Sequence, residues 1–285
     1  MSRVKALGRS LNIGFFELGL TFLWFSVLPA SWLTGLTARC IPNPDYGLHW
    51  NQYLWLPIVG FVNAGVICLL AFALHALHFP AAFAAGASAL LYPATSFFIH
   101  EDGVADAVDA YSAPHKDSFT VMTDPHVGAL GSLSSNSISL FHIFTTATLL
   151  YAALTSNSYA IVPILASATL SRFLCYVLLL EHLSLLHKSF IKNLYDPLTV
   201  PQGQRFRNLN LFFAFAVIFT TTALMVVPHF LLPISLTMAA CAFTFTIVAP
   251  RVIHHFGYLY GDMFGLFIII TQIAACTLCI PLYSY

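Results

Sequence analysis

The sequence predicts an all-α polytopic membrane protein, and three observations support that fold class. First, 59% of the 285 residues are hydrophobic and only 8% are charged, whereas a soluble domain is about 25% charged. Second, the mean hydropathy of +0.82 is far too high for a disordered chain. Third, eleven Lys and Arg residues balance eleven Asp and Glu residues, so the chain lacks the basic excess of a nucleic-acid-binding protein.

The apolar runs predict about seven transmembrane helices, because each spanning helix needs about 20 apolar residues. This arrangement leaves no room for a soluble domain, so we expect one integral-membrane domain over residues 1–285. The runs lie at 11–38, 55–79, 81–99, 137–155, 158–186, 210–230, 231–249 and 263–283.

Three polar stretches interrupt these runs, at 100–136, 187–209 and 250–262. The stretch 187–209 is basic, and the positive-inside rule therefore places it in the cytoplasm. Two spans separate it from each of the other stretches, which predicts that all three lie on the cytoplasmic face. A single active site can then draw on all of them.

The first apolar run, 11–38, is predicted to be a re-entrant N-terminal segment. The same count of spans places segment 39–54 in the cytoplasm, and the positive-inside rule places the basic N-terminal flank there too. A single straight span cannot begin and end on one side of a membrane. Glu17, Pro29 and Gly35 within the run are compatible with a broken hairpin.

The acidic residues are concentrated, because six of the eleven fall between 101 and 124. Asp102, Asp106 and Asp109 are spaced i, i+4 and i+7, which puts them on one face of a helix. Like charges at this spacing destabilise a helix, and each Asp at mid-bilayer costs about 2.5 to 3.5 kcal/mol. A hard divalent cation offsets that repulsion, and Mg²⁺ prefers carboxylate oxygens. We therefore predict that these three aspartates are metal ligands and catalytic residues.

Other polar residues of these stretches are candidates for the same site. Asp262 opens the last apolar run and is predicted to join the metal ligands. Gly128 and Gly131 precede a helix start, where backbone N–H groups bind anions. Arg172 lies inside an apolar run, so a carboxylate or phosphate partner is expected. The predicted substrate-binding residues are Lys116, Asp124, His126, Gly128, Gly131, Arg172 and Arg251.

Several motifs, in order along the chain, resemble those of the cobalamin synthase (adenosylcobinamide-GDP ribazoletransferase) family. The segment from His100 to Asp109 resembles the family signature D-G-x-A-D-x-x-D. Residues 122–131 look like its M-K-D-x-R-x-G-x-x-G segment, with Thr123 and His126 in place of the Lys and Arg. Weaker matches are Leu56-Pro57-Ile58-Val59-Gly60, Ser171-Arg172 and Gly261-Asp262-x-x-Gly265.

The resemblance implies a Mg²⁺-dependent enzyme of the bacterial inner membrane whose active site faces the cytoplasm. It implies adenosylcobinamide-GDP and α-ribazole, or its 5′-phosphate, as substrates, and adenosylcobalamin, or its phosphate, and GMP as products. Membrane lipids are implied partners, and the resemblance leaves open a homo-oligomer and contacts with other enzymes of cobalamin biosynthesis.

Three alternatives remain open from the residues themselves. A cation- or proton-coupled transporter also places carboxylates in a membrane. A lipid enzyme like the CDP-alcohol phosphotransferases uses related carboxylate chemistry, but that class carries D-G-x-x-A followed by Arg, and this chain has Asp106 at the position of that Ala. A catalytically inactive relative that scaffolds pathway enzymes is the third.

Overall fold

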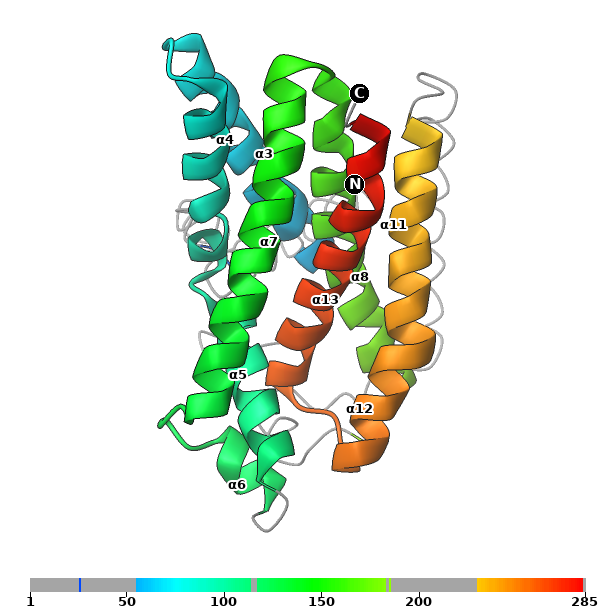
Figure 1. Ribbon diagram of the computed structural model, residues 1–285. Coiled ribbons are helices and arrows are strands. Elements are labelled where there is room, and N and C mark those ends of the chain that lie inside the picture. Colours follow the sequence, from blue (N-terminus) through cyan, green and yellow to red (C-terminus); the bar gives the residue numbers. More distant parts are fainter. Residues whose placement is uncertain (1–25, 27–54, 114–116, 183–184, 186–229, 284–285) are drawn as a thin grey trace, which may run out of the picture.

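The protein is a bundle of long helices, seen in a computed structural model that describes residues 26, 55–113, 117–182, 185 and 230–283 (Figure 1). The predicted re-entrant segment 11–38 (except Ser26), the basic stretch 187–209 and the apolar run 210–230 (except Phe230) lie outside the described residues. The α-helices are α3 (Leu56–Ala76), α4 (Ala81–Leu90), α5 (Ile99–Ser112), α6 (Ser118–Met122), α7 (Ala129–Thr155), α8 (Val162–Glu181), α11 (Leu231–Phe243), α12 (Ala249–Phe256) and α13 (Gly261–Cys279). Short 3₁₀ helices are η3 (Pro93–Ser96), η4 (Ser158–Ile161) and η9 (Ile280–Tyr283), and a π-helical segment, η8 (Thr244–Val248), joins α11 to α12.

Within the described ranges, five helical stretches are long and apolar enough to cross a membrane, and a bent pair makes up to six. The five are Leu56–Ala76, Ala129–Thr155, Ser158–Leu179, Leu231–Phe256 and Gly261–Tyr283. The predicted class, an all-α multi-pass membrane protein, is therefore confirmed.

The predicted apolar run 81–99 ends at a bend, because the chain turns by 72° between the segments Ala81–Ser96 and Ile99–Ser112. Helix α4 ends at Leu90, and Pro93 begins the 3₁₀ turn η3. Proline lacks the N–H that would continue an α-helix. Phe97 and Phe98 then adopt left-handed backbone, with φ of 53° and 58°. Helix α5 therefore starts in a new direction.

Helix α7 begins eight residues earlier than the predicted apolar run, at Ala129 instead of 137. The Ser-rich segment before 137 is helical although it is polar. Gly128 is its N-cap residue, and the helix continues without a break to Thr155. The polar first turns of α7 therefore extend the bundle beyond its apolar part.

The core has two halves, and α13 runs through both. One half joins the C-terminal part of α8 and the start of α13 to α5 and α12, around Phe267, Met263 and Tyr176. The other joins α3, α4, α7, the N-terminal part of α8 and the end of α13, around Ile67, Leu150 and Ile164. Helix α13 packs against α5, α7, α8 and α11, and it therefore holds the helices of the site together.

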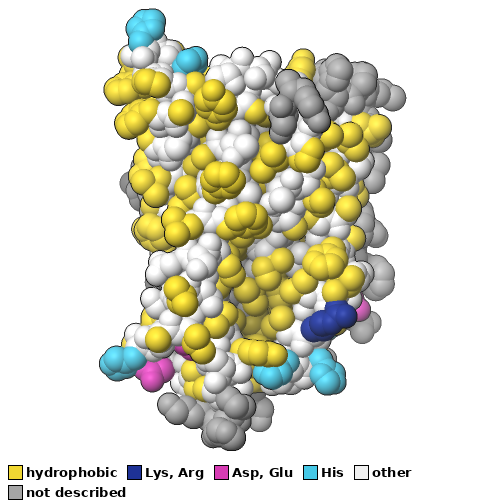
Figure 2. Space-filling model, in the orientation of Figure 1, with side chains coloured by type: hydrophobic (Ala, Val, Ile, Leu, Met, Phe, Trp, Pro, Cys, Tyr) yellow, Lys and Arg dark blue, Asp and Glu magenta, His cyan; other side chains and the backbone are white. Residues whose placement is uncertain are grey.

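One end of the bundle carries α5, α6, α12 and the first turn of α13 (Figure 1). The backbone N–H of Leu259 donates to the carbonyl of Leu185, 2.8 Å away, and the ring of Phe119 contacts the rings of Tyr258 and Tyr260. On the face shown in Figure 2, the charged side chains gather at this end while hydrophobic side chains cover the flank. The described parts of 100–136 and 250–262 share one end, as span parity predicted.

Two glycines allow α5 and α13 to approach backbone to backbone. A Cβ atom on Gly103 would overlap the backbone carbonyl oxygen of Asp262. A Cβ on Gly265 would lie 2.9 Å from Cα and 3.0 Å from the carbonyl oxygen of His100. The contact places the start of α13 directly beside the first turns of α5.

Replacing Gly103 by Ala is expected to destabilise the bundle by about 1–3 kcal/mol, the usual effect of overpacking. The matched control is Gly86→Ala on α4, where a Cβ meets nothing within 4 Å. Alanine in that open helical position should be neutral or stabilising by roughly 0.5–1 kcal/mol. Thermal unfolding of the detergent-purified variants measures both effects, and equal midpoints would contradict the close α5–α13 contact.

Candidate functional site

Helix α5 presents its aspartates on one face and buries the other, as their spacing predicted. Asp102 is exposed, and Asp106 and Asp109 are half-buried. The buried residues of the helix are His100, Glu101, Gly103, Val104, Ala105, Ala107 and Ala110. The small side chains on the buried side let α5 pack closely against its neighbours.

Asp262 joins this aspartate face from the first turn of α13. Asp106 interacts electrostatically with Asp102, Asp262 and Asp109, and Asp262 interacts with Asp102. Asp262 and Asp102 both lie in the first turn of a helix, where the helix dipole favours negative charge. The structure therefore brings together the four predicted metal ligands.

Positive side chains do not neutralise the aspartate face within the described ranges, which contain two arginines. Arg172 donates to His100 and to a carbonyl oxygen of its own helix. Arg251 is exposed on α12 and donates from Nη1 to the carbonyl oxygen of Ile247, 2.9 Å away. Arg251 thus bonds within its own helical stretch, and its predicted contact with substrate stays a prediction. Lys116 lies outside the described residues.

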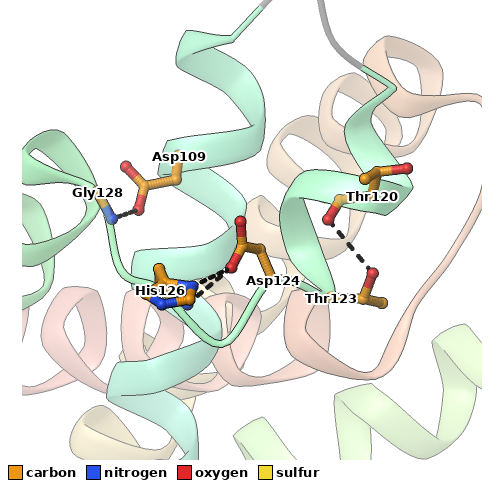
Figure 3. A network of polar contacts seen from close by, with 6 residues as sticks. All are labelled: Asp109, Thr120, Thr123, Asp124, His126 and Gly128. Atoms are coloured by element: carbon orange, nitrogen blue, oxygen red, sulfur yellow. Dashed lines mark hydrogen bonds and ion pairs between the residues drawn. The ribbon is translucent and has the colours of Figure 1, made fainter.

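Asp109 is bound to the start of α7. Its carboxylate oxygens accept hydrogen bonds from the backbone N–H groups of Gly128 at 2.6 Å and Gly131 at 2.8 Å; Figure 3 shows the bond to Gly128. A Cβ on Gly131 would overlap this carboxylate, and one on Gly128 would lie 2.5 Å from it. The predicted anion-binding helix start therefore holds an anion that the chain itself supplies. A contact of these glycines with substrate stays a prediction.

Asp124 and His126 lie on the turn that leads to Gly128 (Figure 3). Oδ1 of Asp124 accepts from the backbone N–H of His126 at 3.0 Å and lies 2.7 Å from Nδ1 of its ring. The two side chains are 53% and 90% exposed. Both side chains are thus exposed at this end of the bundle, and their predicted substrate-binding role stays a prediction.

Among the described residues, Arg172 makes no direct hydrogen bond to a carboxylate, although it interacts electrostatically with the buried carboxyl of Glu101. The side chain of Arg172 is 2% exposed, and its Nη2 lies 3.0 Å from Nε2 of His100 instead of a carboxylate or phosphate. His100 precedes Asp102 by two residues, which is about 200° around the helix. Arg172 therefore contacts α5 on the side opposite the aspartates. Sequence reasoning missed His100 as a partner, although a polar residue on the apolar side of α5 was a usable signal.

The described residues contain no ready-made group of three or more His, Cys, Asp or Glu side chains that could hold a metal ion. Proteins usually bind Mg²⁺ through one or two carboxylates while substrate phosphates and water complete the octahedron, and metal binding by the predicted ligands stays a prediction. Asp102, Asp106 and Asp262 supply oxygens of that kind and are not paired with either described arginine.

The fold and the site define a class, a multi-pass α-helical membrane protein with a carboxylate cluster at one end of its bundle. The chain belongs to the cobalamin-5-phosphate synthase family, whose sequence profile matches residues 17–280. The chain is 33% identical over 113 residues to the adenosylcobinamide-GDP ribazoletransferase of Chlorobaculum tepidum and 31% identical over 115 residues to that of Chlorobaculum parvum. Each match covers 38% of this chain and 43% of the relative's length. No solved structure matches the chain significantly.

Asp109→Ala is expected to lower the free energy of unfolding by about 1–3 kcal/mol, because it leaves two backbone donors at the start of α7 without their acceptor. Asp102→Ala, at an exposed position, should change it by less than about 0.5 kcal/mol. Chemical or thermal unfolding in detergent without divalent ions measures the difference. If Asp109→Ala were as stable as Asp102→Ala, Asp109 would not anchor α7.

Proposed function

We propose that this chain transfers the adenosylcobinamide-phosphate group from adenosylcobinamide-GDP to α-ribazole or its 5′-phosphate. The acceptor hydroxyl oxygen forms a new bond to the phosphorus attached to cobinamide, and the bond from that phosphorus to GMP breaks. The products are adenosylcobalamin, or its phosphate, and GMP. One observation supports this proposal: Asp102, Asp106 and Asp262 lie close enough to interact electrostatically, in a chain of the cobalamin-5-phosphate synthase family.

Mg²⁺, held by the carboxylates of Asp102 and Asp262 beside Asp106, would supply the positive charge that neutralises the pyrophosphate and the leaving GMP. The proton of the acceptor hydroxyl must go to a base. Asp109 already accepts two backbone N–H bonds, so we assign proton acceptance to Asp106. General-base catalysis of this kind contributes about 10²–10⁴-fold.

The substrates are proposed to lie at the end of the bundle that carries Asp124 and His126. Lys116, Gly128, Gly131 and Arg251 belong to the proposed binding surface on sequence grounds. His126 is 90% exposed and, when protonated, can partly replace the Arg of the family motif as a phosphate contact. We place this end at the cytoplasmic face of the bacterial inner membrane.

One observation favours transport as a second candidate, namely the 72° break between α4 and α5. Transporters build substrate sites from broken helices, usually in corresponding positions of two repeats. Among the described residues there is one such pair. Ion flux into proteoliposomes that depends on Asp102 and Asp106, without any transferase activity, would favour this candidate over the enzyme.

Asp102→Asn and Asp106→Asn are each expected to lower transfer by about 10²–10⁴-fold, because Asn is a weaker metal ligand and a poor base. A purified-protein assay with adenosylcobinamide-GDP and α-ribazole measures GMP release. Removal of divalent ions with EDTA should abolish release, and added Mg²⁺ should restore it. Asp117→Asn is the control, since Asn also caps a helix start. Wild-type rates in both variants, or full activity in EDTA, would contradict the proposal.

The orientation is tested with cysteines at the two ends of α7. His126→Cys, just before the helix, should react with a membrane-impermeant maleimide only after intact cells are permeabilised. Ser156→Cys, just after the helix, should react from outside. The unsubstituted chain gives the background of the native cysteines. The opposite pattern would place the aspartates on the outer face.

A further inference from the structure

The direction of α5 is not determined by the helix that precedes it. The 72° bend separates it from α4, and Phe97 and Phe98 interrupt regular helical backbone between the two. Phe98, the N-cap residue of α5, makes no side-chain hydrogen bond to the start of the helix. The rotation of α5, and with it the direction of the aspartates, must therefore be determined by contacts with other helices.

Directional contacts hold α5 at two levels. Near its C-terminal end, Asp109 accepts the two N–H bonds from the start of α7. In its first turn, His100 contacts Arg172 of α8, and Ser135 of α7 donates to the carbonyl oxygen of Glu101 at 2.8 Å. His100 and Asp109 are separated by about 13 Å of helix. Asp102 and Asp106 lie between these two levels.

Arg172 is itself held in place from two sides. Its Nη1 donates to the carbonyl oxygen of Ala168, one turn earlier on α8, at 3.1 Å. Its aliphatic stem lies against α3 at Gly60, where a Cβ would overlap the carbonyl oxygen of Ala168 and come within 2.7 Å of Cδ of Arg172. Only a residue without a side chain leaves this space at position 60. The guanidinium therefore reaches His100 from a packed position that has little freedom.

The chemistry of the contact fixes the state of His100. Arginine has only donors, so Nε2 of His100 must accept from Nη2. The ring is then neutral and carries its proton on Nδ1. The bond needs an acceptor atom as far from the α5 backbone as Nε2 of His100 is. A shorter side chain at position 100 therefore cannot form it.

We propose that Gly60, Arg172 and His100 form a positioning unit behind α5, which holds the helix so that Asp102 and Asp106 face the substrate. None of the three residues is on the aspartate face. The effect on catalysis rests on the proposed transferase function, whereas the effect on the orientation of α5 does not.

The test compares His100→Gln with His100→Asn. The amide oxygen of Gln extends about as far as Nε2, while that of Asn extends only as far as Nδ1. His100→Gln should keep the bond to Arg172 and transfer at nearly the wild-type rate. His100→Asn should lower kcat per folded protein by about 10²-fold, the effect of a misplacement of about 1 Å. Arg172→Lys, which cannot bond both Ala168 and His100 in the same way, should behave like His100→Asn and serves if that variant does not fold.

A readout that needs no activity is the labelling of Ala110→Cys by a soluble maleimide. Ala110 is 2% exposed and lies in the same core cluster as Phe264, so a rotated α5 should expose it. Labelling should rise several-fold with His100→Asn and stay unchanged with His100→Gln. Native Cys175, which is fully buried on α8, should stay unlabelled throughout if the rest of the bundle is intact. Peptide mass spectrometry separates the two positions.

The positioning unit is supported if His100→Asn both lowers kcat and raises the labelling of Ala110→Cys, while His100→Gln changes neither. Equal losses in both variants, or unchanged labelling in His100→Asn, overturn it. If the wild-type chain shows no transfer, the proposed function fails, and the labelling contrast between the two variants still decides whether His100 orients α5.

Discussion

The site depends on the burial of one face of a helix whose other face carries three negative charges. Helix α5 must pack tightly enough to stay in place, yet apart from His100 and Glu101 it offers only small side chains for packing. The backbone contact at Gly103 and Gly265 meets this requirement, and it brings Asp262 to the other aspartates at the same time. The contact at these two glycines therefore both packs α5 on α13 and adds Asp262 to the aspartate face.

The aspartates have different surroundings although their spacing along the helix is regular. Asp109 faces the start of α7 and accepts one backbone N–H bond on each carboxylate oxygen. Asp102 is exposed, while Asp106 is half-buried among like charges. One face of a single helix can thus carry both a structural carboxylate, Asp109, and carboxylates that are available to a metal or a proton, Asp102 and Asp106. Substitution of each aspartate tests a different property of the molecule.

Periodic and topological features were predictable from the sequence. The spacing of Asp102, Asp106 and Asp109 predicted their common face, and the parity of spans predicted that Asp262 would lie at the same end. The bend before α5 was not predictable, because it depends on the backbone of Phe97 and Phe98, which hydropathy does not record. The partners of Asp109 and Arg172 were also missed, since a charged residue in an apolar run shows that a partner is needed but does not identify it. His100, 72 residues from Arg172, is brought to it only by tertiary packing.

The contact between α5 and α13 also limits how this chain can tolerate change. At Gly103 and Gly265 an added Cβ meets backbone atoms of the opposite helix and no side chain. Substitution of an opposing side chain by a smaller one therefore cannot relieve the overlap, and only a displacement of a whole helix can. A second-site suppressor of a substitution at either glycine should accordingly map to residues that set the separation of the two helices, and not to the residues in contact.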